Sequence, residues 1–237
     1  VFLFILFDWG SYNEDTFAYF YNASNQVAGG YHCVNVAGWD DNYPKSNFTI
    51  ESIPGSTPPS NGAWLVKNTW GSEWGDNGYF RVSYNDPELR YFAMYHAEPV
   101  DNYLRNYQYD PFGWIDSLGY NDDFDGSDFF ANIFTSEAKE VIGAVSFYST
   151  ADDAEYTISI FTDTGNLPEQ GRHYYGGEGF IAHTGYHTVE IAHPVPVEVG
   201  QKFSVVINQT TPGYGYPVPA EYNLEGYSEN ATASRGQ

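Results

Sequence analysis

Short apolar runs, several of them alternating with polar residues, are separated along the chain by turns rich in glycine, proline, asparagine and aspartate. In the first part of the chain these runs predict strands, because β-branched and aromatic residues between turn residues favour extended backbone. Residues 40–62 form a long, proline-containing excursion, and residues 15–22 fit either a short helix or an aromatic loop. The predicted strands are 1–7 (VFLFILF), 31–39 (YHCVNVAGW), 63–68 (AWLVKN) and 79–84 (YFRVSY).

From Tyr103 onward the strand-like runs are more evenly spaced, after a boundary segment, EPVDNY. They lack the 3.6-residue period of a helix, so the pattern predicts an antiparallel sandwich whose strands each bury one face. We therefore predict a mainly β protein, with a first domain at 1–97, a second at 98–228 and a flexible tail at 229–237. The strands predicted in the second domain are 131–135, 140–149, 155–163, 186–192 and 202–210.

The charge balance is strongly acidic, since 31 acidic and 9 basic residues among 237 give a formal net charge of -22. A nucleic-acid partner requires a basic face to neutralise its phosphates, and an anionic membrane surface requires the same, so both are excluded as partners. Aromatic residues make up 19% of the chain. They supply the apolar surface that a disordered acidic chain lacks, and we expect a compact protein that does not insert into a membrane.

Cysteine usage and composition bear on the cellular location. Cys33 is the only cysteine, so no disulfide can form within the chain. Acidity, abundant tyrosine, asparagine, glycine and threonine, and scarce lysine are typical of exported microbial surface proteins, and we predict an extracellular or cell-surface location. The opening run VFLFILF is too short to span a bilayer and has no basic residue before it. We interpret it as a buried strand, not a signal peptide, in a chain that begins inside a domain.

One histidine and one asparagine fall on neighbouring predicted strands, on either side of the long excursion. In an antiparallel register whose paired positions sum to about 100, Val34 lies opposite Val66 and His32 lies opposite Asn68. Opposed side chains are roughly 4.5–5.5 Å apart at Cβ, within hydrogen-bonding reach of an imidazole and a carboxamide. Asn68 would then fix the tautomer of the ring and leave its other nitrogen to activate a nucleophile, while Trp70 shields the bond from water.

The segments GGYHCVNVAGWDD and GAWLVKNTWGSEWGDNGYFRVSY resemble the histidine and asparagine segments of papain-like (C1 family) cysteine peptidases. The resemblance covers residues 1–97 and implies the C-terminal, β-rich half of a papain-like α+β domain. It implies that His32 is the general base, Asn68 its orienting residue, and Trp70 and Trp74 the aromatic cover of the site. The implied mechanism is attack of a thiolate on a peptide carbonyl, followed by hydrolysis of the acyl-enzyme.

The nucleophilic cysteine and the oxyanion-hole glutamine of that family have no counterpart in this chain, so we expect them upstream of Val1. Cys33 directly follows His32, and adjacent strand residues point to opposite faces. We therefore interpret Cys33 as a small buried residue on the inner face of a strand and not as a nucleophile. This chain alone is expected to be inactive, whereas a longer parent protein would hydrolyse peptide or protein substrates without a cofactor.

The second region, including GWIDSLGY and GQKFSVVI, is similar to the lectin-like β-sandwich that follows the catalytic domain in some bacterial and archaeal papain-like peptidases. This resemblance implies a glycan or another cell-surface polymer as a partner. Tyr214 and Tyr216, which lie in Gly-Tyr turns, fit two roles: they can stack on sugar faces, or they can pack at strand ends.

The run NDDFDGSDFFAN is the best candidate for a metal site. It places Asn121, Asp123, Asp125 and Ser127 at positions 1, 3, 5 and 7 of a calcium loop of the EF type. However, Asn132 stands where such a loop needs glutamate, and no helices flank it. An acidic, solvated turn is favoured over a weak structural Ca²⁺ site, and no other metal site is predicted.

Two functions from different classes remain open. The first is an exported cysteine endopeptidase with an appended binding module, which the retention of His32, Asn68 and Trp70 favours. The second is a non-catalytic cell-surface or glycan-binding protein with a degenerate peptidase scaffold. A reading frame upstream that encodes a glutamine followed by a cysteine supports the first, and serine or glycine at the cysteine position supports the second. The acidic field also predicts that basic or neutral peptides associate faster than acidic ones.

Overall fold

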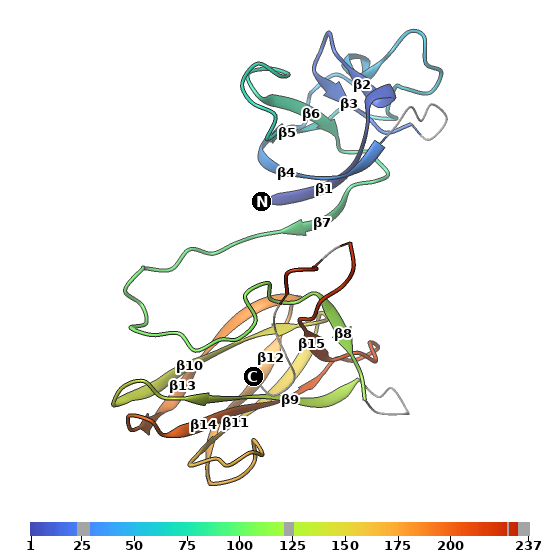
Figure 1. Cartoon of the computed structure of the whole chain (residues 1–237). Helices are drawn as coiled ribbons and strands as arrows, with labels where there is room; N and C mark the ends of the chain where they lie inside the picture. The colour runs from blue at the N-terminus through green and yellow to red at the C-terminus, as the bar shows by residue number, and fades with distance from the viewer. Residues whose placement is uncertain (23–28, 121–125, 227, 232–237) are drawn as a thin grey trace. The chain divides into compact units, whose positions relative to one another are not determined.

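A computed structural model shows that the regular secondary structure of the described residues consists almost entirely of strands, joined by long loops (Figure 1). The prediction of a mainly β protein is confirmed. Among the described residues the helical elements are two 3₁₀ turns, η1 (Trp9–Ser11) and η3 (Lys45–Phe48). The chain divides into two compact units, unit 1 at Val1–Asn102 and unit 2 at Tyr103–Gln237. The structure describes residues 1–22, 29–120, 126–226 and 228–231.

Unit 1 contains a seven-stranded sheet in the order β2-β3-β6-β5-β4-β1-β7. Neighbouring strands are antiparallel except β3 and β6, which are parallel. All the strands predicted in this part of the chain are present, with ends that differ by one or two residues, and the segment 15–22 contains β3. The strands are β1 (Phe2–Asp8), β2 (Tyr12–Asn13), β3 (Ala18–Tyr19), β4 (Gly29–Asp40), β5 (Ala63–Lys67), β6 (Tyr79–Ser83) and β7 (Arg90–Ala93).

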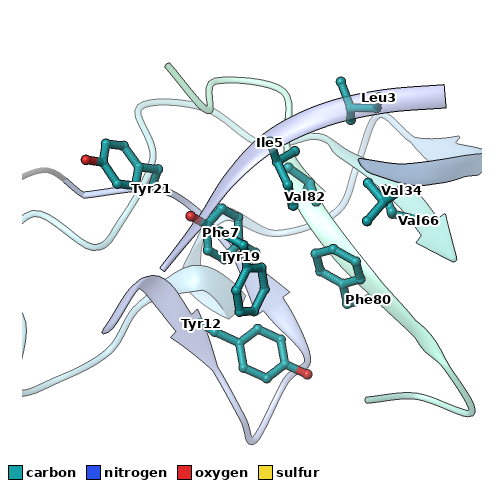
Figure 2. Packing of buried hydrophobic residues seen from close by; sticks show 10 residues of the cluster. All are labelled: Leu3, Ile5, Phe7, Tyr12, Tyr19, Tyr21, Val34, Val66, Phe80 and Val82. Carbon is teal, nitrogen blue, oxygen red and sulfur yellow. The ribbon is translucent and has the colours of Figure 1, made fainter. Parts of the chain in front are cut away.

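The larger of the two buried clusters in unit 1 lies on one face of this sheet (Figure 2). Alternation along β1 places Leu3, Ile5 and Phe7 on that face, and all three are buried. The ring of Tyr19 stacks on Phe7, with centroids 5.0 Å apart and planes 14° apart. The phenol oxygen of Tyr19 also accepts a hydrogen bond of 3.2 Å from the backbone N–H of Asp8. This packing holds the end of β1 in place, and β1 pairs with the histidine-bearing strand β4.

Unit 2 is a sandwich of antiparallel strands. One layer is the sheet β12-β11-β14-β9, the other is the pair β10-β13, and a small sheet pairs β15 with β8. Buried residues of both layers meet in one core, for example Val145 and Phe147 of β10 with Ile158 and Ile160 of β11. The strands are β8 (Asp116–Leu118), β9 (Ser127–Thr135), β10 (Glu140–Ser149), β11 (Ala154–Thr162), β12 (Arg172–Ile181), β13 (Gly185–Val197), β14 (Lys202–Thr210) and β15 (Val218–Ala220).

Strand β12 is missing from the strands predicted above. Its sequence, RHYYGGEGFI, contains glycines, which weaken a strand signal. Gly176 is required by a close approach: a Cβ at this position would lie 2.7 Å from Cγ2 of Ile158 in the neighbouring strand. The pairing of β11 with β12 also shifts register after Ile158. The glycines therefore mark a bulge between two strands and not the turn that the pattern indicates.

The flexible tail predicted at 229–237 is described only in part. The backbone N–H of Ala231 donates a 2.9 Å hydrogen bond to the carbonyl of Ser228, and Ala231 is buried. Residues 232–237 lie outside the described part of the chain.

Candidate active site

The pairing of β4 with β5 brings the predicted histidine and asparagine together, but in a different register from the predicted one. Val66 lies opposite Val36, not Val34, and Lys67 lies opposite Asn35. Continued by one residue, this pairing sets Val34 opposite Asn68. The predicted register is therefore wrong by two residues at this end of the strand pair and by three at the other end, where Asp40 lies opposite Ala63. It overlooks a bulge in β4 at position 37, after which the paired positions shift by one.

The hydrogen bond between the two side chains is present in spite of this shift. Nε2 of His32 lies 2.8 Å from Oδ1 of Asn68. A shift of two residues leaves every side chain on its original face, so His32 becomes a diagonal neighbour of Asn68 and not its direct partner. Diagonal neighbours are within reach of long or aromatic side chains. His32 is half-buried and Asn68 is 5% exposed, which places the bond at the edge of the core.

A second hydrogen bond determines how the carboxamide of Asn68 is oriented. The backbone N–H of Thr69 donates to Oδ1 of Asn68 at 2.8 Å. Because this N–H can only donate, the atom that faces it must be the amide oxygen. The same oxygen faces Nε2 of His32, so Nε2 carries the proton in the neutral ring. Nδ1 is left with its lone pair, as a general base requires.

A layer of aromatic rings covers the imidazole. The indole of Trp70 stacks on His32, with centroids 5.0 Å apart and planes 15° apart. Trp74 meets Trp70 edge to face at 4.9 Å. Trp9, which the sequence patterns did not identify, stacks on Trp70 at 5.4 Å. Trp9 and Trp70 are 49% and 41% exposed, so together they extend an apolar surface from the histidine into solvent.

Tyr12 adds a neutral phenol to this layer. Its ring stacks on Trp74, with centroids 5.1 Å and planes 18° apart. Burial, assisted by the negative charge of Glu14, raises the pKa of Tyr12 to about 12. The phenol therefore remains uncharged near neutral pH, and it brings no negative charge to the aromatic layer around His32.

The loop between β5 and β6 turns back on itself, so that Gly78 at its end lies beside Asn68 at its start. The backbone N–H of Asn68 donates to the carbonyl of Gly78 at 2.9 Å. Gly75 has a φ of +59°, and a Cβ there would lie 2.5 Å from the carbonyl oxygen of Tyr79. A side chain at Gly75 is thus excluded both by backbone conformation and by space. This glycine closes the loop that carries the indoles of Trp70 and Trp74.

Cys33 is half-buried and free. It lies in β4 between His32 and Val34, and Val34 is buried in the core of unit 1. Strand alternation therefore directs the thiol of Cys33 to the face opposite His32. The predicted location of Cys33 on the inner face of the strand is wrong, because that face is occupied by its two neighbours.

The candidate calcium loop lies mostly outside the described part of the chain. This applies to Asn121, Asp123 and Asp125, whereas Ser127 begins β9. Among the residues that the structure describes, no three His, Cys, Asp or Glu side chains are grouped so that they could hold a metal ion.

Comparison with known proteins assigns the two parts of the chain. Residues 106–237, more than half of its length, match the model of the lectin like domain family. Residues 7–97 match the model of the papain family cysteine protease. The chain belongs to the lectin-like domain family, and a segment that matches the papain family model precedes that domain. The segment that matches the papain family model contains both His32 and Asn68.

Individual relatives agree with this assignment. Serine-repeat antigen protein 5 of Plasmodium falciparum is 34% identical over 71 residues, which are 30% of this chain and 6% of that protein. Cathepsin B-like CP1 of Giardia intestinalis is 32% identical over 53 residues, 22% of this chain and 12% of that protein. The chain therefore spans only a small part of the curated relatives that it matches.

The fold is shared with solved structures of the cysteine protease Cwp84, described as a surface layer associated protein of Clostridium difficile. The structure after propeptide cleavage has a TM-score of 0.73 and 23% identity, and the match covers 95% of this chain and 55% of that one. The structure of its cysteine protease and lectin-like domains has a TM-score of 0.65, with 100% and 51% covered. In the described part of this chain, no helix is long and apolar enough to cross a membrane.

Proposed function

We propose that this chain supplies the histidine and asparagine of the active site of an exported papain-type cysteine endopeptidase, whose nucleophilic cysteine lies upstream in a longer protein. One observation carries the proposal: the 2.8 Å contact between Nε2 of His32 and Oδ1 of Asn68, in a carboxamide oriented by the backbone of Thr69. It leaves the Nδ1 lone pair of His32 available for a thiol proton.

The proposed reaction follows from that protonation state. Nδ1 of His32 accepts the proton of the upstream thiol, and the thiolate adds to the substrate's peptide carbonyl. The imidazolium then donates this proton to the departing amine, which leaves an acyl thioester. Water attacks the thioester with His32 again as base, so that the acid product departs and the thiol is restored. Throughout, the bond to Asn68 holds the ring and keeps Nε2 protonated.

The direct test joins this chain to the segment encoded upstream in its reading frame and measures hydrolysis of a casein substrate. Activity should be abolished by a thiol alkylator and by His32→Ala, whereas the exposed His96→Ala variant, a matched control, should retain it. Activity that survives alkylation, or that His32→Ala leaves intact, contradicts the proposal. An upstream frame with serine or glycine at the cysteine position supports instead the non-catalytic scaffold.

For unit 2 we propose binding of a glycan on the outer face of the four-stranded sheet. A groove of about 660 Å³ lies there, within the size range of small-ligand sites. Tyr120 and Phe129 on its walls are 67% and 64% exposed, and Glu169 adds a carboxylate beside the apolar floor of Val206. Exposed rings stack on the apolar faces of sugars, and a carboxylate accepts hydroxyl hydrogen bonds.

The earlier candidates for sugar stacking do not line this groove. Tyr214 and Tyr216 pack edge to face against each other with centroids 5.6 Å apart, and they are 37% and 45% exposed. Affinity electrophoresis in gels that contain laminarin, hydroxyethyl cellulose or glycol chitosan separates the two locations. Retardation that is lost in Phe129→Ala and kept in Tyr214→Ala supports the groove, and the reverse result supports the tyrosine turn.

A cell-surface location follows as part of the same proposal. A glycan-binding unit in the same chain as a peptidase unit would hold the enzyme near a polymer, and Cwp84, a structural relative, is described as a surface layer associated protein. The acidic composition is consistent with this location. Fractionation of cells that express the longer protein tests it, since recovery from the cytoplasm alone would contradict it.

A further inference from the structure

A pocket in unit 1 lies at the opposite end of β4 from His32. It has a volume of about 370 Å³ and is lined by Trp39, Trp64, Tyr84 and Asp41. Trp39 is seven positions along the chain from His32, which corresponds to about 23 Å of extended chain. The pocket is thus distinct from the candidate active site. We call these four residues the aromatic cage.

The walls of the cage are held by the backbone. Trp39 and Trp64 are direct partners across β4 and β5, so their side chains lie on the same face of the sheet. The ring of Tyr84 meets Trp64 at 4.8 Å with a 58° angle between the planes. Gly62 makes room for it, since a Cβ at that position would lie 2.4 Å from Cδ2 of Tyr84. The two rings therefore form two fixed walls of a corner.

Trp39 is the open wall of the cage. Its side chain is 69% exposed, although tryptophan is among the residues that are usually well covered in folded proteins. An exposed indole that faces a second indole and a phenol is a surface suited to a ligand. Its π face attracts a cation in particular, because the ring quadrupole is negative there.

The rim of the cage is acidic. The phenol of Tyr84 donates a 2.9 Å hydrogen bond to Oδ1 of Asp41. The pKa of Tyr84 is raised to about 12 by burial, by its hydrogen bond to Asp41, and by the negative charges of Asp41 and of the more distant Asp40. Tyr84 thus remains a neutral donor that orients the Asp41 carboxylate. Among the described residues, neither Asp40 nor Asp41 takes part in an ion pair.

The lysine and arginine side chains of unit 1 have partners elsewhere, so none of them pairs with the negative charge of the cage. Lys45 donates to the carbonyl of Pro59, and Arg90 pairs with Glu88. Lys67 lies over the ring of Tyr79 and Arg81 over that of Tyr43.

We propose that the aromatic cage binds the cationic side chain of an arginine or lysine in a partner polypeptide. Aromatic walls and a carboxylate together match a guanidinium or ammonium group on a flexible apolar stem, since the stem packs on the indoles while the head pairs with Asp41. A neutral sugar also stacks on indole rings, but the negative charge of the rim does not attract it. The cage is therefore a binding site separate from His32, and this inference does not depend on the proposed peptidase activity.

The test uses the 237-residue chain and a small peptide probe. Acetyl-Gly-Arg-Gly-amide is titrated while the indole N–H signals of Trp39 and Trp64 are followed by NMR. The control peptide contains citrulline, which has nearly the shape of arginine without its charge. We expect the arginine peptide to bind with a Kd of about 1 mM or below, and the citrulline peptide at least about tenfold more weakly.

Variants locate the binding site. Trp39→Ala should weaken binding at least about fivefold, and Asp41→Asn should weaken it and reduce its dependence on salt. Met94→Ala is the matched control for the first, because Met94 has the same 69% exposure in unit 1. The exposed Asp15→Asn is the control for the second. Asp41→Asn also leaves both indoles in place, so a loss of binding in that variant cannot come from a lost wall.

Three outcomes overturn the proposal: no shift of the indole signals up to 20 times the expected Kd, equal binding of arginine and citrulline peptides, or unchanged affinity in Trp39→Ala. Binding of cellotetraose at Trp39 that Asp41→Asn leaves unaltered would identify a sugar site in its place.

Discussion

The indole of Trp70 lies parallel to the imidazole of His32, with the ring centroids 5.0 Å apart. Trp70 therefore covers the hydrogen bond that His32 makes with Asn68, and we expect Trp70→Ala to expose that bond to water. The Nε2–H proton of His32 should then exchange with solvent at least about tenfold faster, as measured by NMR on this chain. Trp70→Phe should retain part of the protection. Unchanged exchange in Trp70→Ala would show that the indole does not shield the bond.

Removing the carboxamide should change the tautomer of the histidine. In Asn68→Ala, Nε2 of His32 loses its acceptor, so the preference for a proton on Nε2 should weaken, which ¹⁵N chemical shifts of the ring report directly. In the joined, active protein we expect kcat to fall by about 10- to 100-fold with a small change in KM, because the ring is then oriented wrongly for proton transfer. A fall in kcat without any change of tautomer would indicate general damage to the fold.

Asp86 should make unit 1 less stable as the pH rises. It is 6% exposed, and burial raises its pKa to about 6 even though the backbone N–H groups of Tyr21 and Glu88 donate to its carboxylate. Between about pH 4 and pH 6 the folded state thus binds more protons than the unfolded state. The free energy of unfolding should therefore decrease through this window, by up to about 3 kcal/mol from this group.

The Asp86→Asn variant isolates that contribution. Its free energy of unfolding should lack this part of the pH dependence, as measured by urea denaturation at pH 4, 5, 6 and 7. Tryptophan fluorescence reports mainly on unit 1, because all tryptophans except Trp114 lie in residues 1–102. The exposed Asp15→Asn should keep the slope of the native chain. Equal slopes for the native chain and Asp86→Asn would refute the assignment to Asp86.

A methyl group at Gly75 should destabilise the loop between β5 and β6. Its φ of +59° and the 2.5 Å approach to the carbonyl oxygen of Tyr79 both oppose a Cβ. We expect Gly75→Ala to lower the free energy of unfolding by about 1–3 kcal/mol. Gly30→Ala, where a Cβ meets nothing within 4 Å, should change it by less than about 1 kcal/mol in either direction. Urea titration of both variants makes the comparison, and equal effects would contradict it.

The contact between His32 and Asn68 could be predicted from the sequence because it depends on which face of a strand each residue occupies, and alternation by two is readable from the apolar pattern. The register could not be predicted, because nothing in the pattern around Ala37 indicates that one residue is left unpaired. The prediction succeeded for these two side chains because the error at their end of the strand pair was an even number of residues.

The contribution of Trp9 could not be predicted either. Its contact with Trp70 joins two elements that are remote in the sequence, and the ring of Phe7 at the end of β1 contacts both indoles. The same holds for the aromatic cage, whose walls come from β4, β5 and the residue after β6. Patterns within one segment predict strands and faces, whereas contacts between segments depend on three-dimensional packing.

The bulge at Ala37 determines which single-residue deletions the pairing of β4 with β5 can accommodate. Asn68 and Trp64 lie on the same face of the sheet. In β4, His32 and Trp39 lie on that face as well, although they are an odd number of positions apart. They do so because Ala37 is left unpaired as a bulge. A deletion of Ala37 would therefore leave both ends of β4 facing as they do. A deletion of one residue within β5 would turn one end to the other side of the sheet and separate either the imidazole from its carboxamide or one indole from the other.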